Sequence, residues 1–298
     1  MKIIEVKDLK KYFGKIHAVD GISFDVQKGE IFGFLGPNGA GKTTTIRCIM
    51  DFVNLTSGKI SIFEKDAQKD SALLKKKIGF LPGNVRLFEG WTGWDHIKFI
   101  EGVHGESEKI SELIRKLDFN PKIKTRQLSS GNKQKLGLIL ALMNNPELLI
   151  MDEPTVGLDP LLQNTIYEIL EDLKKKGTTI FMSSHNLPEV ERLCSRVAII
   201  RAGKIVALES IHDLHKKRMH HVKITFGGEF NKDAFKADGI EIEQVLSDGL
   251  ILGVKGDINP LVKKIATSNL IDIEITHATL EEIFLEFYAK HEANEKEN

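Results

Sequence analysis

The 298-residue sequence has few features of a secreted, metal-binding or membrane-spanning protein. Its two cysteines, Cys48 and Cys194, are too few and too scattered for a disulfide framework or a metal site, so we interpret both as small apolar residues in a reducing compartment. No apolar run approaches the roughly 18 to 20 residues that cross a bilayer. The amino-terminal stretch alternates like a strand and does not resemble a signal peptide. We therefore expect any membrane role to come through a partner.

The sequence also lacks an excess of charge of either sign. Lysine and arginine total 42, aspartate and glutamate also total 42, and the formal net charge is zero. A general attraction to nucleic acid or to anionic lipid is therefore not indicated, and we expect no nucleic-acid partner. The length suits one large domain and one small domain.

The larger domain is predicted to be α/β and to cover residues 1–215. Early stretches alternate apolar and polar residues, as antiparallel strands do, and later apolar strands alternate with helices, which predicts a parallel sheet. The early stretches are KIIEV (2–6) and ISFDV (22–26); the later ones are EIFGFLG (30–36), ELLIMDE (147–153) and TTIFMSSH (178–185). Residues from about 85 to 145 have helical spacing and form a helical subdomain.

Residues 216–290 are predicted to form a small α+β domain. Four strands surround a helix near 259–269, and a short helix at NKDAFKA (231–237) would complete the order βαββαβ, a ferredoxin-like arrangement. A last helix is expected at LEEIFLEFYAK (280–290). The polar residues 291–298 are expected to be a disordered tail.

The stretch GPNGAGKTTT (36–45) predicts a phosphate-binding loop. Glycines at this spacing let backbone N–H groups surround phosphates, while Lys42 reaches the outer phosphates and the hydroxyl of Thr43 binds Mg²⁺. A helix beginning near Lys42 would direct its positive end toward the same phosphates. The alternative is a glycine-rich turn without a ligand.

Two further strand ends carry the residues that would distinguish hydrolysis from simple binding. ELLIMDE ends on Asp152 and Glu153, where Asp152 would hold Mg²⁺ or its water and Glu153 would polarise the attacking water. FMSSH ends on His185, which we assign to the γ-phosphate. The alternatives are an N-cap pair for the next helix and a surface histidine.

The ordered set GPNGAGKT, LSSGN, LLIMDEP, VGLD and SSH closely resembles the ATP-binding subunit of ABC transporters, over about residues 1–212. The resemblance implies an ATPase fold with an antiparallel β subdomain and a helical signature subdomain. It also implies that two such subunits close head to tail on two ATP molecules. An identical second copy is the expected partner, and a related ATPase subunit is the alternative.

The resemblance assigns roles to matching positions of this sequence. The Walker A residues that bind ATP and Mg²⁺ are Gly36, Pro37, Asn38, Gly39, Ala40, Gly41, Lys42, Thr43 and Thr44; the signature residues that reach the γ-phosphate of the other subunit are Ser129, Ser130, Gly131 and Asn132. Asp159 would couple the two sites across the dimer. Ser130 and Asn132 stand where glycine and glutamine are commoner, which we expect to weaken nothing essential.

Two other positions are less settled by the pattern. An adenine-stacking aromatic residue is expected just before Gly14, where Phe13 stands, with Tyr12 as the alternative; either ring could instead be core. In IGFLPGN, Gly83 replaces the Q-loop glutamine and is followed by Asn84. We therefore carry over the loop's role in sensing Mg²⁺ and the transmembrane partner, but not its side chain. Asn84 could substitute, or Gly83 could leave the role to water.

The resulting interpretation is an ATP-hydrolysing subunit that powers an ABC transporter. HATLEEIFLEFY (277–288) resembles the ending of exporter ATPases that pair with a separate ABC-2 membrane subunit, so we expect an exporter with a transmembrane permease. The chain would be cytoplasmic and held on the inner face of the membrane by that permease. The alternative is a soluble ATP-driven switch that acts on nucleic acid or ribosomes.

Overall fold

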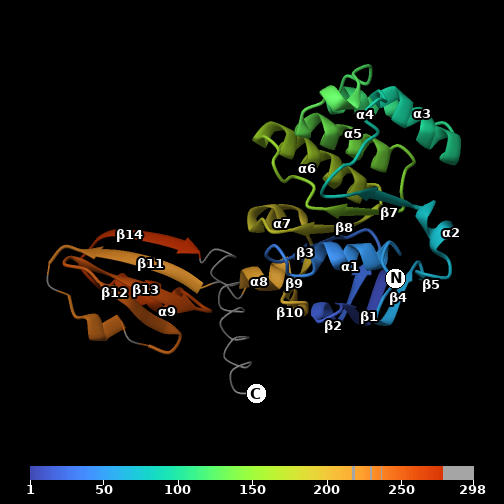
Figure 1. Ribbon diagram of the computed structural model, residues 1–298. Helices are drawn as coiled ribbons and strands as arrows, with labels where there is room; N and C mark the ends of the chain where they lie inside the picture. Colours follow the sequence, from blue (N-terminus) through green and yellow to red (C-terminus); the bar gives the residue numbers. More distant parts are fainter. Residues whose placement is uncertain (217–218, 229, 236, 278–298) are drawn as a thin grey trace. The chain divides into compact units, whose positions relative to one another are not determined.

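The computed structural model describes residues 1–216, 219–228, 230–235 and 237–277 (Figure 1). The chain divides into two compact units, of which the first is Met1–Leu208 and the second begins at Glu209. We expected the boundary after residue 215. The structure instead groups helix α8 (Ile211–Lys216) with the second unit, because the change in composition that we followed comes after this helix rather than before it.

The first unit begins with a four-stranded antiparallel sheet in the order β2-β1-β4-β5. Its strands are β1 (Lys2–Phe13), β2 (Ile16–Gln27), β4 (Ser57–Ile62) and β5 (Lys65–Asp66). Buried residues alternate with half-buried or exposed ones along β2, so one face of this sheet packs inward. The predicted antiparallel pairing of the first two strands is confirmed.

A six-stranded sheet in the order β10-β9-β3-β8-β7-β6 forms the centre of the first unit. Its strands are β3 (Ile31–Leu35), β6 (Ile78–Leu81), β7 (Leu148–Asp152), β8 (Thr179–Ser184), β9 (Arg196–Arg201) and β10 (Lys204–Ser210). The strands from β9 to β6 run parallel, and every residue of β3, β7 and β8 is buried. The predicted parallel sheet is confirmed.

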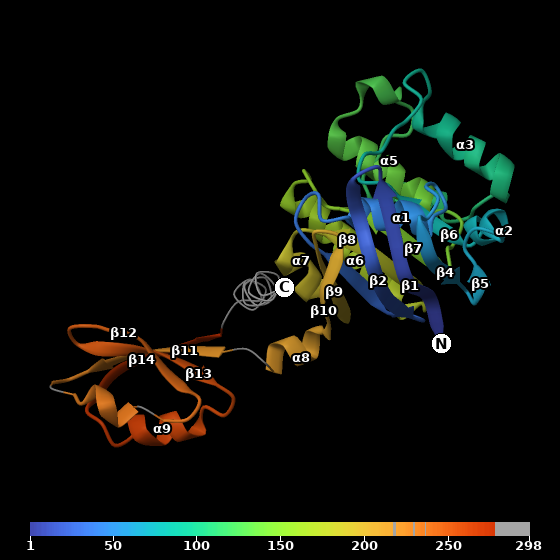
Figure 2. The ribbon, with the colours of Figure 1, turned by 60° about the horizontal axis from the view of Figure 1, so that its bottom comes forward.

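Helices connect the strands of this sheet. They are α1 (Lys42–Ile49), α2 (Ser71–Lys75), α3 (Gly93–His104), α4 (Ile110–Lys116), α5 (Ser130–Leu142), α6 (Pro160–Lys175) and α7 (Leu187–Leu193), with a 3₁₀ turn η1 (Thr125–Gln127). Figures 1 and 2 show α3 and α5 gathered outside the strands, as expected of a helical subdomain. In the part of the chain that the structure describes, no helix is long and apolar enough to cross a membrane.

The core of the first unit lies where its two sheets and α1 pack together. Phe24 of β2 contacts Phe32 and Phe34 of β3 and Phe181 of β8, with ring centroids 5.4 to 5.8 Å apart. Aromatic rings at this spacing stabilise packing beyond the area that they bury. This contact fixes strand β3, and with it the start of the loop that follows, against the antiparallel sheet.

The second unit contains a four-stranded antiparallel sheet in the order β12-β13-β11-β14. Its elements are β11 (Met219–Phe226), the 3₁₀ turn η2 (Lys232–Phe235), β12 (Ile240–Val245), β13 (Gly249–Lys255), α9 (Asn259–Ile265) and β14 (Leu270–His277). The first connection therefore contains a 3₁₀ turn where we expected a short α-helix. The predicted last helix (280–290) and the polar tail lie outside the described residues.

A glycine allows the close approach of α5 to the edge strand β6. A Cβ atom on Gly79 would lie 2.2 Å from the carbonyl oxygen of Ala141 in α5 and 3.0 Å from Pro146. Real Cβ atoms do not approach a backbone oxygen so closely, so any larger residue would push the helix off the strand.

We predict that Gly79→Ala lowers the free energy of unfolding by about 2 kcal/mol, since overpacking of this kind costs roughly 1 to 3 kcal/mol. Gly102→Ala in α3 is the matched control, because a Cβ there would meet no atom of the described residues within 4 Å. It should raise the free energy of unfolding by about 0.5 to 1 kcal/mol through helix propensity. Denaturant titration measures both, and equal stability of Gly79→Ala and the parent chain would contradict this packing.

Candidate nucleotide site

Three sequence motifs lie at the carboxyl ends of adjacent parallel strands. Strand β3 leads into the glycine-rich loop, β7 ends on Asp152, and β8 ends on Ser184, directly before His185. The three strands are neighbours in the order β3-β8-β7. Because the carboxyl ends of parallel strands share one edge of a sheet, the fold brings these motifs together at the place where open α/β sheets bind ligands.

The glycine-rich loop has a backbone that only glycine tolerates at several positions. Gly39 and Gly41 have φ values of 80° and 110°. A Cβ atom on Gly41 would lie 2.5 Å from the carbonyl oxygen of Ala18, and one on Gly36 would lie 2.3 Å from that of Ile200. The glycines are therefore required by the packing of the loop as well as by any bound phosphate.

Lys42, the first residue of α1, is only 5% exposed and fully partnered. Its ammonium group donates to the carbonyl oxygens of Gly36 at 2.7 Å and Pro37 at 3.1 Å, and lies 3.0 Å from Oε1 of Glu153. A buried ammonium group is stable only with such partners. The contact with Glu153 joins the phosphate loop to the end of β7.

Asp152 is held from two sides. Oγ1 of Thr43 donates a hydrogen bond to one of its carboxylate oxygens at 2.7 Å, and Oγ of Ser183 donates to the other at 2.6 Å. The side chain is buried. Hydroxyl and carboxylate oxygens are the ligands that Mg²⁺ prefers, so Thr43 and Asp152 are suited to that ion. Ser183 was not among the predicted residues, although it lies within the FMSSH stretch that led to His185.

Glu153 has a left-handed backbone, with φ of 50°, that a glutamate rarely adopts. Its N–H group lies within hydrogen-bonding distance of both the carbonyl oxygen and Oγ of Ser183, at 3.2 and 3.0 Å. Strain of this kind is held only where the surrounding structure fixes it, and such sites are often functional. The turn places the Glu153 side chain between a lysine and a histidine.

His185 is the second partner of Glu153. Its Nδ1 lies 3.1 Å from Oε2 of Glu153, while the histidine side chain remains 44% exposed. The imidazole is thus oriented by a carboxylate and still accessible to a ligand. The structure brings together Lys42, Glu153 and His185, which were predicted from three separate stretches of sequence.

The two candidate aromatic residues have different surroundings. Tyr12 donates its hydroxyl hydrogen bond to Asp20 at 2.6 Å and stacks on His17, with ring centroids 3.9 Å apart. Phe13 is 48% exposed, with the ammonium group of Lys11 4.6 Å from its ring centroid. Since Tyr12 is committed to neighbours of its own strand pair, Phe13 is the ring with an available face.

A cavity of about 730 Å³ lies beside the Asp152 and Glu153 carboxylates. Thr43 and Asn84 also line it, and a Cβ atom on Gly83 would lie 3.0 Å from the carbonyl oxygen of Asp152. Among the described residues Asn84 makes no hydrogen bond, and its side chain is exposed. The loop that departs from the family pattern therefore borders the same site, without a long side chain at Gly83.

The signature residues lie at the start of another helix. Ser129 caps α5 by accepting a hydrogen bond from the N–H group of Asn132 at 3.3 Å, and Ser129 and Ser130 are exposed. Asp159 likewise caps α6 by accepting from the N–H groups of Leu161 and Leu162. Within the described part of the chain, no hydrogen bond or ion pair joins the signature residues or Asp159 to the phosphate loop. A single chain therefore contains both the phosphate loop and the signature residues, but it does not bring them into contact through such bonds.

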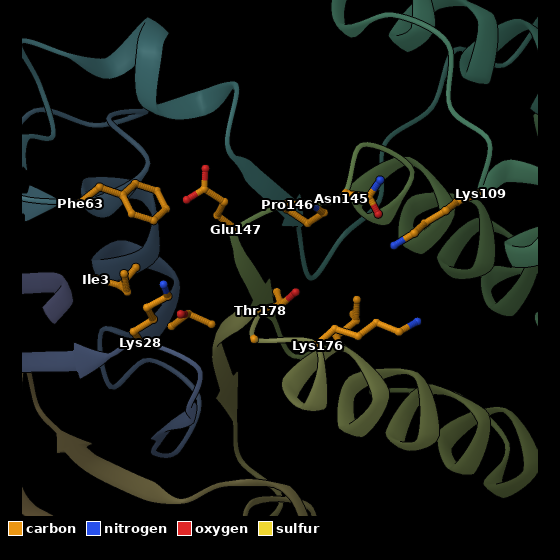
Figure 3. Close-up of a pocket in the computed structure, with 12 residues that line it drawn as sticks. Ile3, Lys28, Phe63, Lys109, Asn145, Pro146, Glu147, Lys176 and Thr178 are labelled. Atoms are coloured by element: carbon orange, nitrogen blue, oxygen red, sulfur yellow. The ribbon is translucent and has the colours of Figure 1, made fainter. Parts of the chain in front are cut away.

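A second cavity, of about 420 Å³, lies at the opposite ends of β7 and β8 (Figure 3). Figure 3 shows Lys28 and Lys109 on opposite sides of it, with Glu147 and Thr178 between them. None of the predicted site residues lines this cavity. The predicted phosphate-binding and hydrolytic residues thus lie at the carboxyl edge of the sheet and not at this cavity.

Comparison with known proteins agrees with this geometry. The family model described as ABC transporter matches residues 19–156. The linearmycin resistance ATP-binding protein LnrL of Bacillus subtilis (strain 168) is 40% identical over 219 residues, covering 71% of this chain and 70% of that protein. The bacitracin transport ATP-binding protein BcrA of Bacillus licheniformis is 33% identical over 299 residues, covering 95% and 96%.

Solved structures have the same fold. A structure described as the ATP binding subunit of an ABC transporter has a TM-score of 0.67 at 30% identity and covers 72% of this chain and 92% of its own. A dimeric ATP-binding cassette bound to ADP and Pi has a TM-score of 0.64 at 22% identity, a likeness of fold. Motifs, geometry and relatives agree that this chain belongs to the ATP-binding subunits of ABC transporters and is an ATPase.

Proposed function

We propose that this chain hydrolyses Mg²⁺-bound ATP at the edge of its six-stranded sheet and thereby drives export through a separate membrane permease. The observation that carries the proposal is the junction of Lys42 and Thr43 with Glu153 and Asp152, at 3.0 and 2.7 Å. A phosphate-binding lysine and a metal-binding hydroxyl thus contact the two carboxylates that a hydrolytic site needs.

Binding of the triphosphate would be the task of the phosphate loop. Its backbone N–H groups and the start of α1 favour anions, and the Lys42 ammonium group would exchange loop carbonyls for phosphate oxygens. The proposed phosphate-binding set is Gly36, Pro37, Asn38, Gly39, Ala40, Gly41, Lys42, Thr43 and Thr44. The exposed ring of Phe13 would stack on adenine.

Thr43 and Asp152 would hold Mg²⁺. Among the described residues no cluster of three or more acidic, histidine or cysteine side chains could hold a metal alone, so phosphate oxygens would complete the ligand set. When bound, Mg²⁺ neutralises charge on the transferred phosphoryl group. Ser183 keeps the Asp152 carboxylate in position for this role. Asn84, which lines the adjoining cavity, would contribute at most through water.

Hydrolysis would depend on Glu153 and His185. Glu153 would accept a proton from the attacking water once Lys42 turns to the phosphates and leaves its carboxylate free to do so. His185, whose Nδ1 lies 3.1 Å from the same carboxylate and whose side chain is 44% exposed, would turn a ring N–H toward the γ-phosphate and donate a hydrogen bond to it. The strained backbone of Glu153 fixes the direction of its side chain before the substrate arrives.

The site would be completed by a second subunit. The exposed amino end of α5 carries Ser129, Ser130, Gly131 and Asn132, and its N–H groups and hydroxyl are suited to an anion. Since no hydrogen bond or ion pair among the described residues joins them to the phosphate loop of their own chain, we propose that they reach the γ-phosphate of an identical copy. Asp159 would lie between the two sites and couple them.

The permease would hold the chain on the cytoplasmic face of the membrane. The names of the relatives refer to bacitracin transport, linearmycin resistance and, for a protein of Rhizobium sp. that is 37% identical over 233 residues, Nod factor export. These names support outward transport by the partner of this chain. They do not favour the alternative of a soluble switch on nucleic acid or ribosomes.

We predict that Glu153→Gln binds ATP as well as the parent chain but lowers kcat by at least about a hundredfold, since the amide is no proton acceptor. Lys42→Ala is the contrasting variant and should weaken nucleotide binding itself. Steady-state ATPase assays and a fluorescent ATP analogue separate the two effects. Turnover of Glu153→Gln at the parent rate would remove Glu153 from its proposed role.

Mixing two inactive variants tests whether the site is shared. Ser129→Arg damages the signature, and Lys42→Ala damages the phosphate loop, so each variant alone should be inactive. A mixed dimer would keep one intact site, so equal mixing should restore about a quarter of the parent ATPase activity if dimers form at random and the intact site turns over without its neighbour. No recovery on mixing, with both variants folded and able to dimerise, would contradict a shared site that turns over in this way.

A further inference from the structure

A buried carboxylate on α7 has no part in the nucleotide site described above. Glu189 is only 2% exposed, although it carries an ionisable group. Its Oε1 accepts a hydrogen bond from Oγ1 of Thr155 at 2.8 Å, and its Oε2 accepts one from Oγ of Ser184 at 2.6 Å. Both donors are themselves buried.

The two hydroxyl donors belong to the two chain segments that carry the proposed hydrolytic pair, namely the turn after β7 and the end of β8. Thr155 lies two residues after Glu153, and Ser184 directly precedes His185. Oε2 of Glu153 and Nδ1 of His185 are 3.1 Å apart at the surface of the same site. Glu189 therefore bridges the two segments on the buried side, while Glu153 and His185 contact each other on the side of the nucleotide site.

Such a carboxyl group is costly to bury. Burial raises the pKa of Glu189, and the hydrogen bonds from Ser184 and Thr155 act in the opposite direction. An apolar side chain of similar size would fill the same space without desolvating a charge, and replacements of this kind are often neutral or stabilising. A buried carboxylate that accepts hydrogen bonds from two hydroxyl groups fixes the positions of the residues that donate them. This positioning explains the presence of Glu189 better than a contribution to the stability of the fold does.

The helix that carries Glu189 is itself firmly attached. The guanidinium group of Arg192 donates a hydrogen bond to Asn164 of α6 at 2.7 Å and lies 4.7 Å from the ring centroid of Tyr167. Val190 and Leu193 are buried on the same helix. A group that orients catalytic side chains must sit on such a rigid element.

We infer that Glu189 is a positioning residue that sets the relative placement of Glu153 and His185 for ATP hydrolysis. The inference rests on the proposed roles of that pair. It requires that loss of Glu189 affect turnover rather than nucleotide binding, because among the described residues Lys42 and Thr43 make no hydrogen bond or ion pair with Glu189, Thr155 or Ser184. Ser184 does bond the phosphate loop, but through its backbone carbonyl oxygen, which accepts from the N–H group of Gly36 at 3.2 Å and is kept in every side-chain variant. Small misplacements of reacting groups cost large factors in rate.

The primary test compares Glu189→Ala with Glu189→Gln. The alanine variant should lower kcat roughly tenfold to a hundredfold, the size expected of a misplacement near 1 Å, with the affinity for a fluorescent ATP analogue unchanged. The glutamine variant should recover most of the rate, because its amide can accept a hydrogen bond from one hydroxyl group and donate one to the other. The Ser184 hydroxyl would then donate to the carbonyl oxygen of Asn186, which lies 3.3 Å away. Glu168→Ala, an exposed glutamate on α6, is the control and should leave both quantities unchanged.

Two further variants keep the inference testable if Glu189→Ala does not fold. Thr155→Val and Ser184→Ala each remove one hydroxyl donor, and each should lower kcat with nucleotide affinity unchanged. Added to a folded Glu189→Ala protein, neither should lower kcat further, because groups acting as one unit are not additive. Parent rates in all of these variants, or parallel losses of kcat and nucleotide affinity, would overturn the positioning role.

The same experiments separate this inference from the proposed function. If Glu153→Gln is inactive and Glu189→Ala turns over at the parent rate, the hydrolytic assignment stands and the role of Glu189 falls. If Glu153→Gln remains active, the proposed function fails first, whatever the Glu189 variants do.

Discussion

The buried ammonium group of Lys42 is the constraint on which the nucleotide site depends. A charge that is 95% shielded from water needs partners, and the structure supplies two loop carbonyls and the Glu153 carboxylate. This arrangement requires the glycine backbone of the loop, which brings the carbonyls close. It also requires that β7 end near the phosphate loop that follows β3, and the strand order β3-β8-β7 places the two there. A triphosphate would replace these partners with stronger ones.

Some parts of the site are complete within one chain, and others would need a second copy. Within the chain Thr43 contacts Asp152 and Lys42 contacts Glu153, so nucleotide and Mg²⁺ binding would need a single copy. The signature at Ser129 caps the exposed amino end of α5, and no hydrogen bond or ion pair among the described residues joins it to this junction. Hydrolysis would then require two copies and a correct placement of His185. Turnover would therefore depend on dimer assembly, whereas nucleotide binding would not.

The sequence predicted best those site residues that lie in short motifs. Lys42 and Asp152 follow from local stretches whose spacing the chemistry requires. Ser183 and Glu189 were missed because β8 is buried throughout, so polar and apolar positions do not alternate there, and because a single glutamate on a short helix resembles a surface residue. The sequence already favoured Phe13 over Tyr12, and the contacts of Tyr12 with Asp20 and His17 support that preference. In the second unit the strands could be predicted, but the 3₁₀ conformation of η2 could not. The conformation of such short segments depends on tertiary packing.

The most direct test of this account is to identify what the chain assembles with. The tagged full-length chain would be purified from its native membranes after gentle solubilisation with ATP, and co-purifying proteins would be identified by mass spectrometry. The account predicts a stoichiometric protein with several membrane spans, together with two copies of this chain. Recovery from the soluble fraction with ribosomes or nucleic acid, and without a membrane protein, would contradict the transport role while leaving the ATPase chemistry intact.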